Sequence, residues 1–147
     1  MSSVYYSYKD SCIGSTISEA LELDADAKLN MDDSIATDAI AFSDFLTVDM
    51  RVGQIVEVTE NPKAKKPAYV LNIDFGELGH KTSSAQITQN YSKEELLGKQ
   101  IVAVVNFPSK LVAGVKSEVL VLAAVCEVRG TVLIEPNLSV ENGTRIQ

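Results

Sequence analysis

The segment KTSSAQITQNYSKEELLGKQIVAVVNFPSKLVAGVKSEVLVLAAV, residues 81–125, contains the strongest pointers to the architecture. Its first seven residues predict a polar strand. Ser92 and Glu95 then stand three residues apart, which is the spacing of a capping box, and Gly98 is suited to end a helix in the left-handed conformation. The segment therefore predicts a strand followed by a short capped helix over 92–97.

Two apolar strands follow, over 101–105 and 119–125, separated by a polar loop over 106–118. A short helix between the third and fourth strands is how an OB-type barrel closes its bottom. Both strands are apolar on both faces, whereas a small barrel buries only its inner face. We therefore expect their outer faces to meet the helix, the N-terminal segment or a partner chain, which indicates a homodimer.

The sequence before residue 81 predicts two further strands. Residues 50–59 are rich in Val and Ile, the two prolines of 61–67 exclude a central strand there, and 69–75 alternate with a period of two. A last hairpin is expected between 131–135 and 144–146. Together these elements predict an all-β fold with a short helix: a five-stranded Greek-key OB barrel with a C-terminal hairpin.

The N-terminal segment differs from the rest of the chain. Residues 1–41 contain two lysines and eight acidic residues, whereas 42–147 contain eleven basic and twelve acidic residues. We therefore expect an acidic N-terminal extension, either a mobile tail or helical over about 16–28, followed by one nearly neutral domain on which a local basic patch can exist.

Composition argues against several classes of protein. With His80 as the one histidine and no C-x-x-C pair, we expect no catalytic triad, metal site or cofactor, and hence no enzyme. No apolar run could span a bilayer and no secretory or transit signal is visible, so we expect a cytoplasmic protein without stable membrane insertion. Cys126 extends an apolar strand and is expected in the core; a disulfide with Cys12 stays open, although a reduced state is the simpler interpretation.

Twelve residues are candidates for binding RNA or peptide. They share a polar or aromatic side chain in a mouth loop or on the third strand: Lys63, Lys65, Lys66, Lys81, Ser84, Gln86, Asn106, Phe107, Lys110, Lys116, Ser117 and Glu118.

The loops at the open end of an OB barrel bind oligonucleotides, and clustered ammonium groups attract phosphate. The alternative is that these lysines are only solvated loop residues. Phe107 beside Pro108 can stack on a base or contact an apolar peptide. Glu118, close to two lysines, is expected to orient one of them or to form a weak surface ion pair.

Motifs over residues 42–147 resemble those of stand-alone tRNA-binding domains, and most closely the CsaA-type export-related chaperones. The carrying motifs are Asp49-Met50-Arg51-Val52-Gly53, Pro67-Ala68-Tyr69-Val70-Leu71, Ser83-Ser84-Ala85-Gln86-Ile87-Thr88, Asn106-Phe107-Pro108 and Lys116-Ser117-Glu118-Val119-Leu120-Val121-Leu122.

This resemblance implies a cytoplasmic homodimer with one OB barrel per subunit. It implies binding of tRNA or other single-stranded RNA, in part through Ser84 and Gln86, and a role in holding unfolded preproteins for secretion through the Sec motor. Two hypotheses follow: an RNA-binding protein that acts as an export-related chaperone, or a holdase for which RNA binding is incidental. A purely structural dimer is a third alternative.

Overall fold

The computed structural model describes residues 38–147, so the expected helix over 16–28 and Cys12 lie outside the described residues. The elements in chain order are α4 (Phe42–Thr47), β1 (Met50–Glu60), β2 (Tyr69–Asp74), the 3-10 helix η1 (Gly76–Leu78), β3 (His80–Ala85), α5 (Lys93–Leu96), β4 (Gln100–Val104), β5 (Lys110–Val112), β6 (Val115–Ser117), β7 (Leu120–Val121), β8 (Ala123–Cys126) and β9 (Gly130–Leu133).

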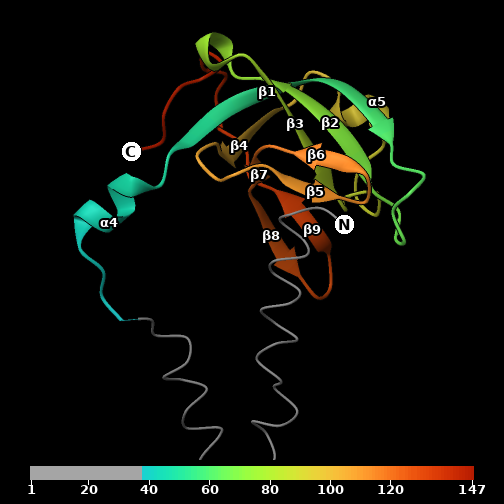
Figure 1. Cartoon of the computed structure of the whole chain (residues 1–147), viewed down its shortest axis with the longest axis horizontal. Coiled ribbons are helices and arrows are strands. Elements are labelled where there is room, and N and C mark those ends of the chain that lie inside the picture. The colour runs from blue at the N-terminus through green and yellow to red at the C-terminus, as the bar shows by residue number, and fades with distance from the viewer. Residues whose placement is uncertain (1–37) are drawn as a thin grey trace, which may run out of the picture.

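Five antiparallel strands form one sheet in the order β3-β2-β1-β4-β7, which curls into a nearly closed barrel (Figure 1). The two edges meet where Glu118 N donates to Thr82 O at 2.7 Å and Ser83 Oγ donates to Val119 O at 3.2 Å. The predicted OB-like barrel is thereby confirmed.

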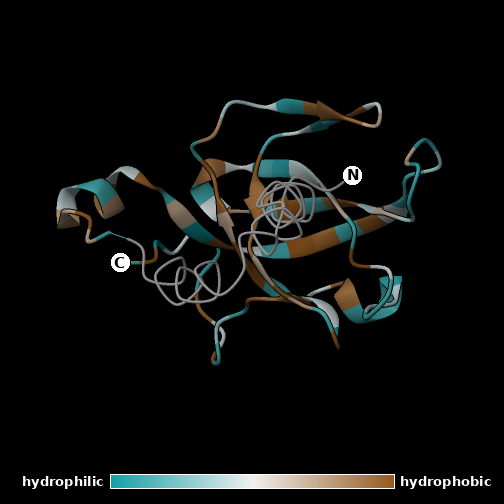
Figure 2. Ribbon diagram, turned by 90° about the horizontal axis from the view of Figure 1, so that it is seen from below, coloured by the Kyte–Doolittle hydropathy of each residue, from teal (hydrophilic) through white to brown (hydrophobic). Residues whose placement is uncertain are grey.

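The alternation predicted for the second strand fills the barrel interior. Leu71, Ile73 and Phe75 are fully buried, and Leu96 of α5 is buried with them at the bottom of the barrel. The capping box is present, since Ser92 Oγ accepts from Glu95 N and the Glu95 carboxylate accepts from Ser92 N. Figure 2 shows that the strands carry most of the apolar segments, whereas the connecting loops are largely hydrophilic.

Strand β1 pairs with β2 along its second half and with β4 along its first half. A bulge between Ile55 and Glu57 bends it between these two partners, as bulges do in small barrels. Gly53 sits at the crossing, where a Cβ atom would lie 2.6 Å from both Ile73 Cγ2 and Phe75 Cε1. A side chain at this position would therefore displace the core.

The last third of the chain departs from the sequence prediction. The loop predicted over 106–118 contains the β5–β6 hairpin, and the single strand predicted over 119–125 is two strands, β7 and β8. Leu122 lies between them; its N–H donates to Val102 O at 2.9 Å and its carbonyl accepts from Ile134 N at 3.1 Å. The β8–β9 hairpin then extends away from the barrel (Figure 1), which leaves Cys126 exposed rather than in the core.

The pairing predicted between 131–135 and 144–146 is absent from residues 38–147. Strand β9 pairs with β8 instead, and Arg145 forms a bridge with Arg51 at the start of β1. The C-terminal segment thus closes on the first strand. No helix within 38–147 is both long and apolar enough to cross a membrane.

Candidate nucleic-acid interface

Two lysine-bearing loops meet at one rim of the barrel. The side chain of Asn61 donates from Nδ2 to Ala113 O at 3.4 Å, and a Cβ atom added to Gly114 would lie 3.0 Å from Lys63 Cδ. The β1–β2 loop therefore rests against the tip of the β5–β6 hairpin. Ala113 and Gly114 both have positive φ, at 46° and 81°, which makes that tip a tight turn.

This contact places next to each other two segments that carry five exposed lysines. We call them the lysine surface: Lys63, Lys65 and Lys66 from the β1–β2 loop, and Lys110 and Lys116 from the hairpin. Clustered ammonium groups of this kind suit a polyanion, and their effect falls with salt.

The register of the hairpin assigns its two lysines to different faces. Lys110 lies opposite Ser117, whereas Lys116 lies opposite Leu111. Directly opposed residues share a face and successive residues alternate, so Lys110 and Ser117 point to one side, and Lys116 and Leu111 to the other. The first of these sides borders a pocket.

That pocket has a volume of about 550 Å³ and lies at the base of the hairpin. Its lining comes from the segment before β5 and the segment after β6: Phe107, Pro108, Ser109, Lys110, Ser117, Glu118, Val119 and Leu120. We call it the Phe107 pocket, because the ring of Phe107 is 54% exposed there. Pro108, Ser109, Val119 and Leu120 were not among the sequence candidates, since nothing in the local sequence shows that these residues face a cavity.

Glu118 anchors a strand rather than a lysine. Its Oε2 accepts from Thr82 N at 3.0 Å while its own N–H donates to Thr82 O at 2.7 Å. This two-point contact fixes the base of the hairpin to β3. Lys81, half-buried, is the residue before Thr82 and so stands next to this junction.

Ser84 and Gln86 lie inside the protein. They are 1% and 8% exposed, and Ser84 Oγ and Gln86 Nε2 have no hydrogen-bond partner within residues 38–147. Ser84 is paired with Val70 on β2, and β3 also packs against β6. A ligand on the present surface would not reach them, so they stay outside the lysine surface.

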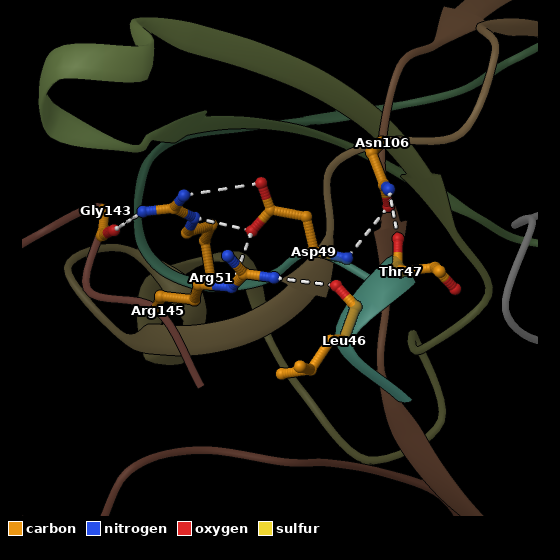
Figure 3. Close-up of polar contacts among 7 residues, drawn as sticks. All are labelled: Leu46, Thr47, Asp49, Arg51, Asn106, Gly143 and Arg145. Carbon is orange, nitrogen blue, oxygen red and sulfur yellow. Dashed lines mark hydrogen bonds and ion pairs between the residues drawn. The ribbon is translucent and has the colours of Figure 1, made fainter. Parts of the chain in front are cut away.

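Asn106 links the pocket loop to the N-terminal arm. Its Oδ1 accepts from Asp49 N at 3.0 Å and its Nδ2 donates to Thr47 O at 2.7 Å (Figure 3). Both polar atoms of the Asn106 side chain therefore bind the backbone that connects α4 to β1. Phe107, the next residue, lies close to this connection.

The Asp49 carboxylate also contacts the guanidinium groups of two arginines. Arg51 donates from Nε at 2.6 Å and from Nη2 at 3.3 Å, and Arg145 Nε lies 3.8 Å from the same carboxylate (Figure 3). Arg51 further donates to Gly143 O, and Arg145 to Leu46 O. This network joins α4, the start of β1 and the C-terminal segment.

Among the described residues, no group of three or more His, Cys, Asp or Glu side chains could hold a metal ion.

Residues 50–145 match the family described as "Putative tRNA binding domain". The chain belongs to this tRNA-binding domain family. The tRNA-binding domain is similar to two solved chaperones: CsaA of Bacillus anthracis (55% identity, TM-score 0.68, covering 75% of this chain and all of that one) and CsaA of Picrophilus torridus (50% identity, TM-score 0.70, covering 74% and all of that one).

A curated relative, the methionine–tRNA ligase of Porphyromonas gingivalis, is 37% identical over 108 residues. The match covers 74% of this chain but only 16% of the ligase. The catalytic part of such ligases is a different domain, and the tRNA-binding domain family is non-catalytic. The expected family is thereby confirmed, with a binding role rather than an enzymatic one.

Proposed function

We propose that the protein binds tRNA or other single-stranded RNA on the lysine surface, as a non-catalytic binding protein. The contact between Lys63 and Gly114 carries this proposal, because it joins two lysine-bearing segments about 50 residues apart into one cationic rim. OB barrels hold oligonucleotides at this rim. The family model and the methionine–tRNA ligases support tRNA as the polyanion.

Filter binding of tRNA across a salt series tests the proposal. For single strands, log K falls by about 0.7 per phosphate contact for each unit of log salt. The double variant Lys63→Gln/Lys65→Gln should therefore bind more weakly at low salt and with a shallower salt dependence. Its matched control is Lys93→Gln/Lys99→Gln, which removes the same charge from lysines paired with Glu60 and Glu135.

The control should bind as the parent does. No tRNA binding at low salt, binding without salt dependence, or equal losses in both double variants would each reject the proposal.

A chaperone role is the second candidate. Two CsaA chaperones are half or more identical to this chain, and Phe107 and Leu111 present exposed apolar side chains beside the lysine surface. We propose that unfolded preproteins, destined for export through the Sec motor, bind the same rim. Suppression of the aggregation of a denatured client, and its loss when tRNA is added, are the expected results. No suppression at stoichiometric protein would contradict this candidate.

We further propose a homodimer, with α4 as the contact. The helix projects from the barrel (Figure 1) and has no buried residue, while Phe42 is 70% exposed and stacks on Phe45. A second copy would cover this apolar arm. Sedimentation of Phe42→Ser/Leu46→Ser should report a monomer, whereas Val128→Ser, on an exposed turn away from α4, should sediment as the parent does. An unchanged mass for the α4 variant would reject this interface.

Because tRNA acts in the cytoplasm, we propose that the protein is located there.

A further inference from the structure

We infer that the Phe107 pocket accepts one unpaired nucleobase of the bound RNA, so that the protein requires a single-stranded segment rather than a duplex. This inference deepens the proposed RNA binding and depends on it. It concerns a site whose occupant neither the family match nor the similar structures specify.

The pocket has the walls that a planar base needs. Phe107 and Pro108 approach from the segment before β5, and Val119 and Leu120 from the segment after β6. An aromatic ring that is half exposed beside an apolar cavity offers a stacking face without further rearrangement. Bases stack on such rings regardless of their identity, since every base has a π-face.

The charge around the pocket favours a nucleotide over an apolar peptide side chain. Lys110 is part of the lining, and Lys81 lies beside Thr82, which is bonded to the pocket residue Glu118. Cations next to a stacking site suit the phosphates on either side of an inserted base. An apolar client would instead bring the exposed Lys110 side chain into contact with hydrocarbon, at a cost in desolvation.

The pocket is also continuous with the lysine surface. Lys110 begins β5, and the three residues of that strand, at roughly 3.3 Å each, lead to the hairpin tip about 10 Å away, where Lys63 lies. An extended strand of RNA can thus place one base in the pocket while its next phosphates follow the hairpin. A base-paired strand cannot do so, because its bases are stacked inside the duplex and must first be extruded.

Fluorescence anisotropy with a labelled RNA of about 12 nucleotides, within the range that one OB fold covers, provides the test. The full chain is titrated with this RNA alone or annealed to its complement. Single-stranded RNA should bind at least tenfold more tightly than the duplex. Phe107→Ala should weaken single-strand binding about tenfold without changing the salt slope, and Phe107→Trp should retain it.

Val128→Ala is the matched control, because Val128 is 89% exposed on the turn between β8 and β9, outside both the pocket lining and the lysine surface. It should bind as the parent does. A 2-aminopurine base in the RNA should lose fluorescence on binding to the parent and keep it with Phe107→Ala. Thermal unfolding of each variant shows whether the fold is intact. If Phe107→Ala does not fold, the 2-aminopurine signal of the parent decides, because fluorescence that is unchanged on binding at every position of the RNA would overturn the inference.

The outcomes separate this inference from the proposed function. If no RNA binds at low salt, the proposed function fails. If RNA binds with a normal salt slope but Phe107→Ala equals the parent, or the duplex binds as tightly as the single strand, the inference alone is overturned. It is equally overturned if Phe107→Ala abolishes only the suppression of client aggregation, because the pocket would then serve a peptide.

Discussion

Asp49 and Arg145, 96 positions apart, share one ion pair network at the point where the chain's N-terminal arm meets the barrel. Arg145 reaches both the Asp49 carboxylate and the backbone of Leu46, and Arg51 completes the network from β1. The C-terminal segment thereby fixes α4, the helix that we propose as the dimer contact. Asn106 binds the backbone N–H of this same Asp49 and the carbonyl of Thr47, two residues before it.

Removal of the Asp49 carboxylate should loosen this arm. Asp49→Ala removes the carboxylate partner of two guanidinium groups, which keep the carbonyls of Gly143 and Leu46, so we expect a loss of about 1–3 kcal/mol in the free energy of unfolding, measured with urea. Glu141→Ala, an exposed acid near the same end of the chain whose side chain lies outside this network, should change it by less than about 0.5 kcal/mol. Equal stabilities of the two variants would contradict the assigned role.

Gly53→Ala should disturb the core although it adds a single methyl group. The new Cβ atom would meet Ile73 and Phe75 at 2.6 Å, closer than real Cβ contacts. Overpacking of this kind costs about 1–3 kcal/mol. Heat unfolding should show a lowered midpoint, whereas Ala124→Ser on the exposed side of β8 should not move it. A midpoint for Gly53→Ala within error of the parent would contradict the close packing of Gly53 against Ile73 and Phe75.

The carboxyl group of Asp74 should titrate below its ordinary value. Its pKa is lowered from 3.8, chiefly by the hydrogen bond from Gly76 N at 2.8 Å and further by Asn142. A lowered pKa in the folded state means that the stabilisation is complete above 3.8 and is lost as pH falls through the folded value. NMR titration should show this midpoint, and Asn142→Ala should raise it. A midpoint at or above 3.8 in the parent would contradict the described contacts.

Deleting residues 1–41 should strengthen RNA binding. These residues contain eight acidic and two basic side chains, so their removal takes away six net negative charges that would repel RNA. We expect a several-fold gain in affinity at low salt that shrinks as salt screens the charges. A version with all eight acids changed to Asn or Gln keeps the length and should show the same gain. Unchanged or weaker binding in both would count against this repulsion.

Local patterns predicted the first half of the barrel well. The alternation of 69–75 and the capping box at Ser92 are encoded by neighbouring residues, and both are confirmed. The later strands depend on contacts between distant segments. Leu122, between β7 and β8, is hydrogen-bonded to Val102 and Ile134, which are distant in sequence, so no local pattern predicts the break there.

The same limit applies to the candidate site. The lysine loops could be predicted individually, but their meeting at Lys63 and Gly114 depends on the hairpin hidden in the polar loop. Ser84 has the polar character of an exposed strand and yet is buried, because burial is set by what packs over the strand. Phe107 was a candidate from sequence, whereas its pocket needed the segment after β6.

Residue-by-residue NMR of the full chain titrated with tRNA tests the central claim most directly. Binding to a single cationic rim predicts that amide signals of 61–67 and 110–117 shift together, along one binding curve that weakens with salt. Shifts confined to residues 134–142, or separate curves for the two lysine-bearing segments, would contradict it.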